Sequence, residues 1–204
     1  MRMQEIITNP PRDEYLDNYR NNLDDAVEVA TIRGLTLKKS QSSSEIVYGL
    51  FDADENLVGY LSLHTIEHPD APSDIWEVSL SQLALAYRGQ GYATFLYDYA
   101  VMNDKLKVLS DGTQTGGPHG SRDMWLRLRN NNRYQVIGYD ADTFKVIPDA
   151  TPEMIYNMEH NTRWLALPPG ESINEAITRI QSKMIKRYVV WYGPGTTTET
   201  YFNY

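Results

Sequence analysis

Two glycines, Gly89 and Gly91, flank a single residue at the end of an apolar segment, residues 83–87. Glycine lets the backbone turn tightly and approach a ligand closely, because it has no Cβ atom. The residues that follow, 92–101, carry apolar side chains at helical spacing. The first turn of a helix offers N–H groups without internal partners and the positive end of the helix dipole. The sequence therefore predicts a main-chain site for an anion such as a pyrophosphate.

Three polar side chains, Glu77, Ser79 and Ser81, precede this loop at a spacing of two. They lie in a segment that predicts a strand over residues 75–85, and alternate residues of a strand share one face. A carboxylate on that face could take a proton from a reacting group. We therefore expect Glu77, Ser79 and Ser81 to line one cleft.

The segments around the loop predict a mixed sheet. Residues 45–51 and 57–65 are rich in apolar and β-branched side chains and are separated by the polar turn 52–56. They predict a hairpin that continues antiparallel into the strand at 75–85. After the predicted helix, the apolar run 106–109 predicts a strand parallel to the one before the loop, which completes a β-loop-α-β crossover.

The remaining elements flank this unit. Apolar side chains at spacings of three and four predict one or two helices over residues 13–31, ended by Gly34. The other expected elements are a short strand at 4–8, helices at 121–130, 152–158 and 172–186, a hairpin of 134–139 with 144–147, and an aromatic C-terminal hairpin at 188–204. The last hairpin would either cover a sheet edge or join a partner subunit.

The loop resembles the acyl-CoA loop of the GNAT superfamily of N-acetyltransferases. That pattern has an apolar strand residue, an aromatic or small residue, Arg or Gln, Gly-x-Gly, an apolar residue, and Ala or Gly. The matching positions here are Leu83, Tyr87, Arg88, Gly89, Gly91, Tyr92 and Ala93, with Leu85 where the family often has proline. The predicted order of elements also resembles the family over residues 1–150. The resemblance implies an α/β mixed sheet of the GNAT acyl-CoA N-acyltransferase fold, with residues 151–204 as a helical, aromatic-rich extension packed on it.

The resemblance also implies that acetyl-CoA is the cosubstrate. The backbone of Leu83 would pair with the pantetheine arm and donate to the oxyanion. The side chain of Arg88 would order the loop or meet a phosphate. The pyrophosphate would bind the backbone amides of Arg88, Gly89, Gln90, Gly91, Tyr92 and Ala93.

By the same resemblance, Glu77 occupies a position where many members place a glutamate base that acts directly or through water. Ser81 and Ser110 are the other candidate catalytic residues. The usual acid of the family is a tyrosine in the helix after the fifth strand, and that place corresponds to Trp125. An indole N–H donates a hydrogen bond but is not a usable acid. The acid in place of that tyrosine would be Ser110, Ser121, Tyr134 or water.

Other binding motifs fit the sequence less well. A Rossmann fingerprint needs Gly or Ala where Thr94 stands, and a Walker A loop needs a Gly-Lys-Ser/Thr run that the sequence lacks. His64 and His68 are four residues apart in a strand-like segment, which breaks the helical spacing of a zinc pair. We therefore expect no metal site.

The composition narrows the classes of function. The chain of 204 residues carries a net charge of −8, which argues against nucleic acid as the main partner and favours a cationic acceptor. It has no cysteine, no apolar run long enough to span a membrane, and no apolar signal segment after Met1. These features predict a cytoplasmic protein without a membrane partner.

The resemblance implies an N-acetyltransferase that moves an acetyl group from acetyl-CoA directly to a primary amine of a small molecule or a protein, in a ternary complex. The alternative is a catalytically degenerate binding or structural protein with the same fold, such as a bacteriophage accessory or virion component. Residues 110–115 and 121–128 resemble a variant found in GNAT-like proteins of tailed bacteriophages. The C-terminal extension would supply the contact of a homodimer or a larger assembly.

Overall fold

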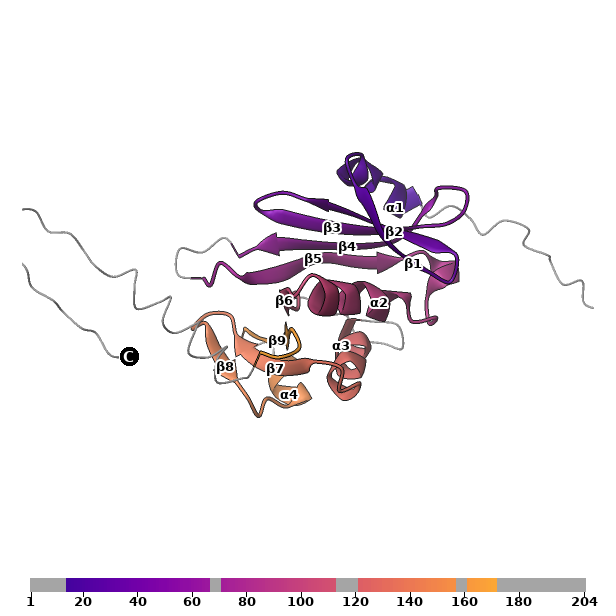
Figure 1. Ribbon diagram of the computed structural model, residues 1–204. Coiled ribbons are helices and arrows are strands. Elements are labelled where there is room, and N and C mark those ends of the chain that lie inside the picture. Colours follow the sequence, from indigo (N-terminus) through magenta and orange to yellow (C-terminus); the bar gives the residue numbers. More distant parts are fainter. Residues whose placement is uncertain (1–13, 67–70, 113–120, 157–160, 172–204) are drawn as a thin grey trace, which may run out of the picture.

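The computed structural model describes residues 14–66, 71–112, 121–156 and 161–171 (Figure 1). These residues form one nine-stranded mixed sheet with the order β1-β2-β3-β4-β5-β6-β9-β7-β8. Helices pack on both faces, and the α/β class with a mixed sheet is confirmed. The strands are β1 (Val27–Ile32), β2 (Leu35–Gln41), β3 (Glu45–Phe51), β4 (Leu57–Thr65), β5 (Ile75–Leu83), β6 (Lys107–Leu109), β7 (Gln135–Asp140), β8 (Lys145–Ile147) and β9 (Thr162–Leu167); the α-helices are α1 (Glu14–Asp17), α2 (Tyr92–Asp98), α3 (Ser121–Asn130) and α4 (Pro152–Tyr156).

The first half of the sheet is an antiparallel meander of β1 to β5. The predicted bounds of β3 and β4 are confirmed, and β5 ends at Leu83 rather than at residue 85. β3 and β4 are buried over nearly their whole length, because other elements cover both of their faces. Their nearly continuous apolar sequences reflect this central position.

The helical prediction for residues 13–31 is wrong over most of its length. Only α1 and a short 3₁₀ turn, Arg20–Leu23, are helical, and β1 follows at Val27–Ile32. β1 is rich in β-branched residues, which favour strands. Gly34 does not end a helix: with Arg33 it forms the two-residue turn from β1 to β2, and both residues have positive φ angles, 83° and 50°. Such a turn is typical of tight hairpins.

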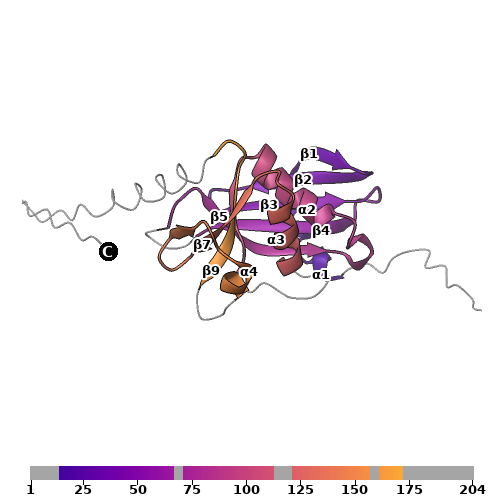
Figure 2. The same cartoon turned by 90° about the horizontal axis from the view of Figure 1, so that it is seen from below.

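The predicted crossover is confirmed. β5 leads through the glycine loop into α2, a π-helical turn at Tyr99–Asn103 follows, and β6 then pairs parallel to β5. The parallel pairing joins only three residue pairs, from Ile75 with Lys107 to Glu77 with Leu109. α2 and α3 lie side by side on the same face of the sheet in both views (Figures 1 and 2).

The second half of the sheet contains β6, β9, β7 and β8. α3 has the predicted bounds, and β7 and β8 form the predicted antiparallel hairpin. β9 was not predicted, and it lies between β6 and β7 as an antiparallel partner of both. The division expected at residue 150 therefore does not follow the sheet, because a strand beyond that point lies inside it. The expected elements at 4–8, 172–186 and 188–204 lie outside the described residues.

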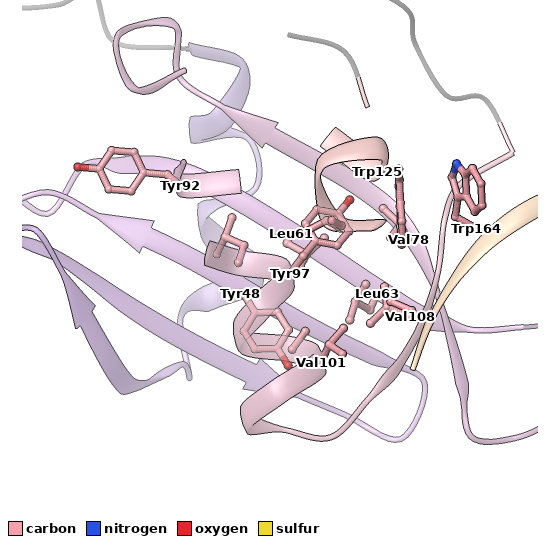
Figure 3. Close-up of a cluster of buried hydrophobic side chains, with 14 of the residues drawn as sticks. Tyr48, Leu61, Leu63, Val78, Tyr92, Tyr97, Val101, Val108, Trp125 and Trp164 are labelled. Carbon is pink, nitrogen blue, oxygen red and sulfur yellow. The ribbon is translucent and has the colours of Figure 1, made fainter. Parts of the chain in front are cut away.

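The larger hydrophobic core lies on the face that α2, α3 and α4 cover. At its centre Trp125 of α3 meets Tyr97 of α2 edge-on, with 5.4 Å between the ring centroids (Figure 3). Both rings are almost fully buried, and Val78 of β5 belongs to the same cluster. On the opposite face α1 and the 3₁₀ turn pack over β3 and β4, as Figure 1 shows.

Replacement of Trp125 by alanine tests this core. The indole is 1% exposed and its ring contact with Tyr97 is close, so its loss leaves a large cavity. We expect the free energy of unfolding to fall by about 3–5 kcal/mol, measured by chemical denaturation. The matched control is Met154→Ala, because Met154 is 42% exposed, and it is expected to cost about 0.5 kcal/mol or less. Equal effects of the two changes would contradict the assignment of Trp125 to the core.

Candidate active site

The site is built on the divergence of β5 from β6. The two strands are paired up to Glu77 and Leu109, after which β6 ends and β5 continues for six residues to Leu83. Within the described residues, this last stretch of β5 pairs only with β4. One edge of β5 therefore has no strand partner between residues 78 and 83 in the described part of the chain, although the Leu83 carbonyl on this edge accepts a hydrogen bond from Arg88.

A β-bulge at Ser79 changes which side chains of β5 share a face. Val78 pairs with Leu63 and Leu80 with Ser62, so Ser79 has no partner of its own in the ladder. An unpaired residue of this kind shifts all later side chains to the other face. Glu77 therefore faces the side of α1, whereas Ser81 faces α2, where its hydroxyl is hydrogen-bonded to that of Tyr97. The expectation that Glu77 and Ser81 line one cleft is wrong for this reason.

The main chain of β5 presents N–H groups to its open edge. The Ala84 N–H donates to the Val58 carbonyl over 2.9 Å, which makes Leu83 and Gly59 a non-hydrogen-bonded pair. In such a pair both residues direct their N–H and C=O groups away from each other, and the two kinds of pair alternate along the ladder. Leu83 and Ser81 therefore both direct their N–H groups toward the edge that β6 leaves open.

The glycine loop follows directly. After a 3₁₀ turn at Leu85–Tyr87, Gly89 and Gly91 adopt φ angles of 74° and 86°, which side chains strongly disfavour. Gly91 is the N-cap of α2, and no side chain caps this end of the helix. A Cβ atom at Gly91 would have no atom within 4 Å, so the space in front of the first turn is open. The chain enters the helix here with uncapped N–H groups next to free space.

Side chains brace the loop from three directions. Arg88 Nε donates to the Leu83 carbonyl over 2.9 Å, and Gln90 Nε2 donates to the Ala86 carbonyl over 2.7 Å. From the β1–β2 turn, Arg33 Nη1 donates to the Gln90 carbonyl over 2.8 Å. The Arg88 side chain therefore ties the loop back to the end of β5. These bonds hold the loop in its conformation without occupying the N–H groups of the first helical turn.

The two predicted binding residues after the loop, Tyr92 and Ala93, are the first two residues of α2. The Tyr92 ring is buried, its centroid lies 6.1 Å from that of the Tyr87 ring, and the guanidinium of Arg33 lies over it at 6.0 Å. Ala93 is the second residue of α2 and offers a backbone N–H in its first turn.

A polar cluster occupies the face of the sheet that carries Glu77. Arg163 of β9 donates from Nη1 to Glu77 Oε1, and His64 Nε2 of β4 lies 3.9 Å from Glu77 Oε2. Arg163 Nε also donates to Asn161 Oδ1 over 2.8 Å. The side chains of Arg163 and Glu77 are 15% and 20% exposed, so the ion pair is largely buried. Glu77 is therefore held by a guanidinium rather than free at its predicted place.

Asp111 completes this cluster from the end of β6. Burial raises the pKa of its carboxyl, Arg163 lowers the pKa, and Glu77 raises the pKa again. Its Oδ1 atom is buried and has no hydrogen-bond partner within the described part of the chain. Sequence reasoning missed both Asp111 and Arg163. The apolar run of residues 164–167 could have revealed β9, but nothing local places Arg163 beside Glu77.

The candidates for the acid lie away from Glu77. The Ser110 side chain is fully buried, and its Oγ accepts a hydrogen bond from the Trp164 N–H over 3.1 Å, which joins β6 to β9. The hydroxyl of Tyr134 lies beside Asp98 near α2, and burial together with that carboxylate raises the pKa of Tyr134 well above its usual range. Trp125 is part of the core, and Ser121 begins α3. None of these four side chains belongs to the cluster around Glu77.

The described segments lack both a metal-binding cluster and a membrane-spanning helix. They contain no group of three or more His, Asp or Glu side chains placed to hold a metal ion, and His68 lies outside them. None of their helices is long and apolar enough to cross a membrane.

Comparisons with known proteins give matches among solved structures alone. No protein-family model matches the chain, and no curated protein matches it. A proposed acyl-CoA N-acyltransferase from Klebsiella pneumoniae is similar at 15% identity, with a TM-score of 0.37, over 78% of this chain and 93% of that one. A chimera of the spermidine N-acetyltransferase SpeG from Vibrio cholerae and hSSAT is similar at 16% identity, with a TM-score of 0.36, over 86% and 82%. A proposed GNAT-family acetyltransferase from Bacteroides thetaiotaomicron is similar at 10% identity, with a TM-score of 0.35, over 87% and 83%.

The pair of Arg163 and Glu77 can be tested by a double-mutant cycle. Arg163→Met leaves the carboxylate without its partner, and we expect a loss of about 1–3 kcal/mol in the free energy of unfolding, between the values for exposed and fully buried pairs. The double variant with Glu77→Gln should recover at least half of that loss, because no unpaired charge remains. Glu55→Gln, which removes the more exposed pair with Lys38, is the control and should cost less than about 1 kcal/mol. Strictly additive effects of the two changes would show that Arg163 and Glu77 do not interact.

Proposed function

We propose that the protein is an acyl-CoA-dependent N-acetyltransferase that uses acetyl-CoA and a primary amine. The observation that carries this proposal is the free edge of β5, which leads through a short 3₁₀ turn into the glycine loop at the uncapped start of α2. An extended arm beside the strand and a pyrophosphate at the loop are the two parts of coenzyme A that these features suit. The order of strand, loop and helix supports the same ligand.

Of the predicted amides of residues 88–93, that of Arg88 donates to the Leu85 carbonyl over 3.3 Å, so the loop would hold the pyrophosphate through the amides of residues 89–93. The pantetheine arm would lie along residues 78–83 of β5 as an added strand, which pairs with main-chain groups and needs no particular side chain. The N–H groups of Leu83 and Ser81 point to that edge, and one of them would donate to the oxyanion of the thioester carbonyl. Preorganised donors of this kind stabilise the transition state because they need not reorient during the reaction.

The acceptor would enter from the face that carries Glu77, Asp111 and His64. Two carboxylates on this face suit a cationic amine, although Arg163 offsets part of their charge. The net charge of −8 would favour the approach of a cation over long distances. Of the residues predicted from the sequence to act in catalysis, Glu77 lies on this face, whereas Ser81 faces α2 and Ser110 is hydrogen-bonded to β9. A carboxylate of this face would take the proton of the amine.

A second candidate function is binding without turnover. The observation that favours it is the burial of Trp125 in the core, at the place where an acid would be expected. A protein of bacteriophage origin that kept the ligand site and lost the reaction would bind coenzyme A and release no thiol. We further propose a cytoplasmic location and a homodimer contact through the extension after residue 150.

Turnover distinguishes the two candidates. Acetyl-CoA mixed with the protein and a broad panel of primary amines should release free thiol in an amine-dependent way, measured with a thiol reagent. Mass spectrometry should find the acetylated amine in the same samples, because direct transfer gives equal amounts of both products. Coenzyme A binding without thiol release from any amine would instead support the binding protein.

Gly91→Glu tests the loop. A carboxylate at the start of α2 would repel the pyrophosphate and fill the open space, so we expect coenzyme A to bind at least about tenfold more weakly in calorimetry, a change of about 1.4 kcal/mol. The matched control is Gly170→Glu, because Gly170 has a φ of 88° against 86° for Gly91 and a Cβ atom would meet nothing within 4 Å at either site. Both variants carry the same backbone strain and the same added charge. Unchanged binding by Gly91→Glu would show that the anion lies elsewhere.

A further inference from the structure

Asp111 lies at the point where β5 and β6 part. It is the second residue after Leu109, which ends β6 and is the partner of Glu77 in the ladder. Alternation along an extended chain places it on the same face as Leu109 and Glu77. The guanidinium of Arg163 lies beside this stretch, since a Cβ atom on Gly112 would come within 3.2 Å of Arg163 Nη2. Asp111 and Glu77 are thus two carboxylates on either side of the opening, with Arg163 next to both.

The carboxylates of Glu77 and Asp111 differ in their hydrogen-bond partners. Arg163 donates to one oxygen of Glu77, and the other oxygen lies 3.9 Å from His64 Nε2. A carboxylate in a largely buried ion pair can accept a proton only by giving up the attraction of its guanidinium. Oδ1 of Asp111, in contrast, is buried without a hydrogen-bond partner among the described residues. Burial without a hydrogen-bond donor disfavours the charged form of a carboxylate, so that the carboxylate binds a proton more readily.

We propose that Asp111, rather than Glu77, accepts the proton of the acceptor ammonium, and that Arg163 is a positioning residue that holds Glu77 in place. This inference rests on the acetyl transfer proposed above. The ammonium transfers one proton to the Asp111 carboxylate, and the free amine attacks the thioester carbonyl. The C–N bond forms, the C–S bond breaks, and the thiolate of coenzyme A receives the second proton of the nitrogen. Asp111 then returns its proton to water.

The sign of the pH dependence follows from the burial of Asp111. Burial raises its pKa, and the groups that face it are the charges of Arg163 and Glu77, with His64 behind Glu77. The base must be deprotonated to act, so kcat/KM should fall as the pH decreases through this raised pKa. The raised pKa also makes Asp111 a stronger base, which favours proton transfer once the pH is high enough.

The experiment compares Asp111→Asn with Glu77→Gln in the full chain, using acetyl-CoA and the amine that gives the highest wild-type rate. Asp111→Asn should lower kcat by about 100-fold or more and abolish the acidic limb of the kcat/KM profile, while calorimetry shows unchanged acetyl-CoA binding. Glu77→Gln should keep the acidic limb. Asp149→Asn, a change at an exposed aspartate, is the matched control and should equal the wild type.

The outcomes separate this inference from the proposed function. In one outcome the wild type turns over, while the acidic limb of the kcat/KM profile persists in Asp111→Asn and disappears in Glu77→Gln. This result would overturn the inference alone and make Glu77 the base. Absence of wild-type turnover with every amine would overturn both. Asp111→Glu covers the case in which Asp111→Asn does not fold: it keeps a carboxylate, so its acidic limb should remain but move to a different pH. An unmoved limb in Asp111→Glu would also overturn the inference.

Discussion

The short parallel pairing of β5 with β6 is the constraint on which the candidate site depends. Three residue pairs fix the two strands together, and the pairing stops at Glu77 and Leu109 while β5 continues to Leu83. A longer β6 would satisfy the N–H groups of Ser81 and Leu83 within the sheet. Because β6 instead turns its later hydrogen bonds to β9 through Ser110, the edge of β5 stays available along the stretch that leads to the glycine loop.

Local sequence was sufficient to predict the parts of this arrangement that local chemistry determines. The bounds of β3, β4 and α3, the crossover and the loop follow from apolar and β-branched runs, helical spacing and two glycines that need positive φ. Three features depend on contacts between distant segments and could not be predicted in this way: the strand at Val27–Ile32, the insertion of β9, and the bulge at Ser79. The bulge matters most for function, because one extra residue places Ser81 on the face opposite to Glu77.

The charges of the site were equally hidden from sequence reasoning. Glu77 lies in β5 as predicted, but its orientation depends on the ion pair with Arg163, which is 86 residues further along the chain. A carboxylate considered from the sequence alone suggests a general base, whereas a carboxylate in an ion pair with a guanidinium has a structural role. The unpaired Oδ1 of Asp111 is visible only once β5, β6 and β9 lie next to one another.

The place of β9 in the sheet has a consequence for how the protein is made. β5, the glycine loop and α2 all lie within the first 98 residues of the chain, and β5 pairs there with its sequence neighbour β4. β9 must enter between β6 and β7, two strands that precede it in the chain, before Arg163 reaches Glu77. Distant contacts of this kind form late, because closing a long loop has a high entropic cost. A nascent chain would therefore contain the glycine loop before Arg163 can pair with Glu77.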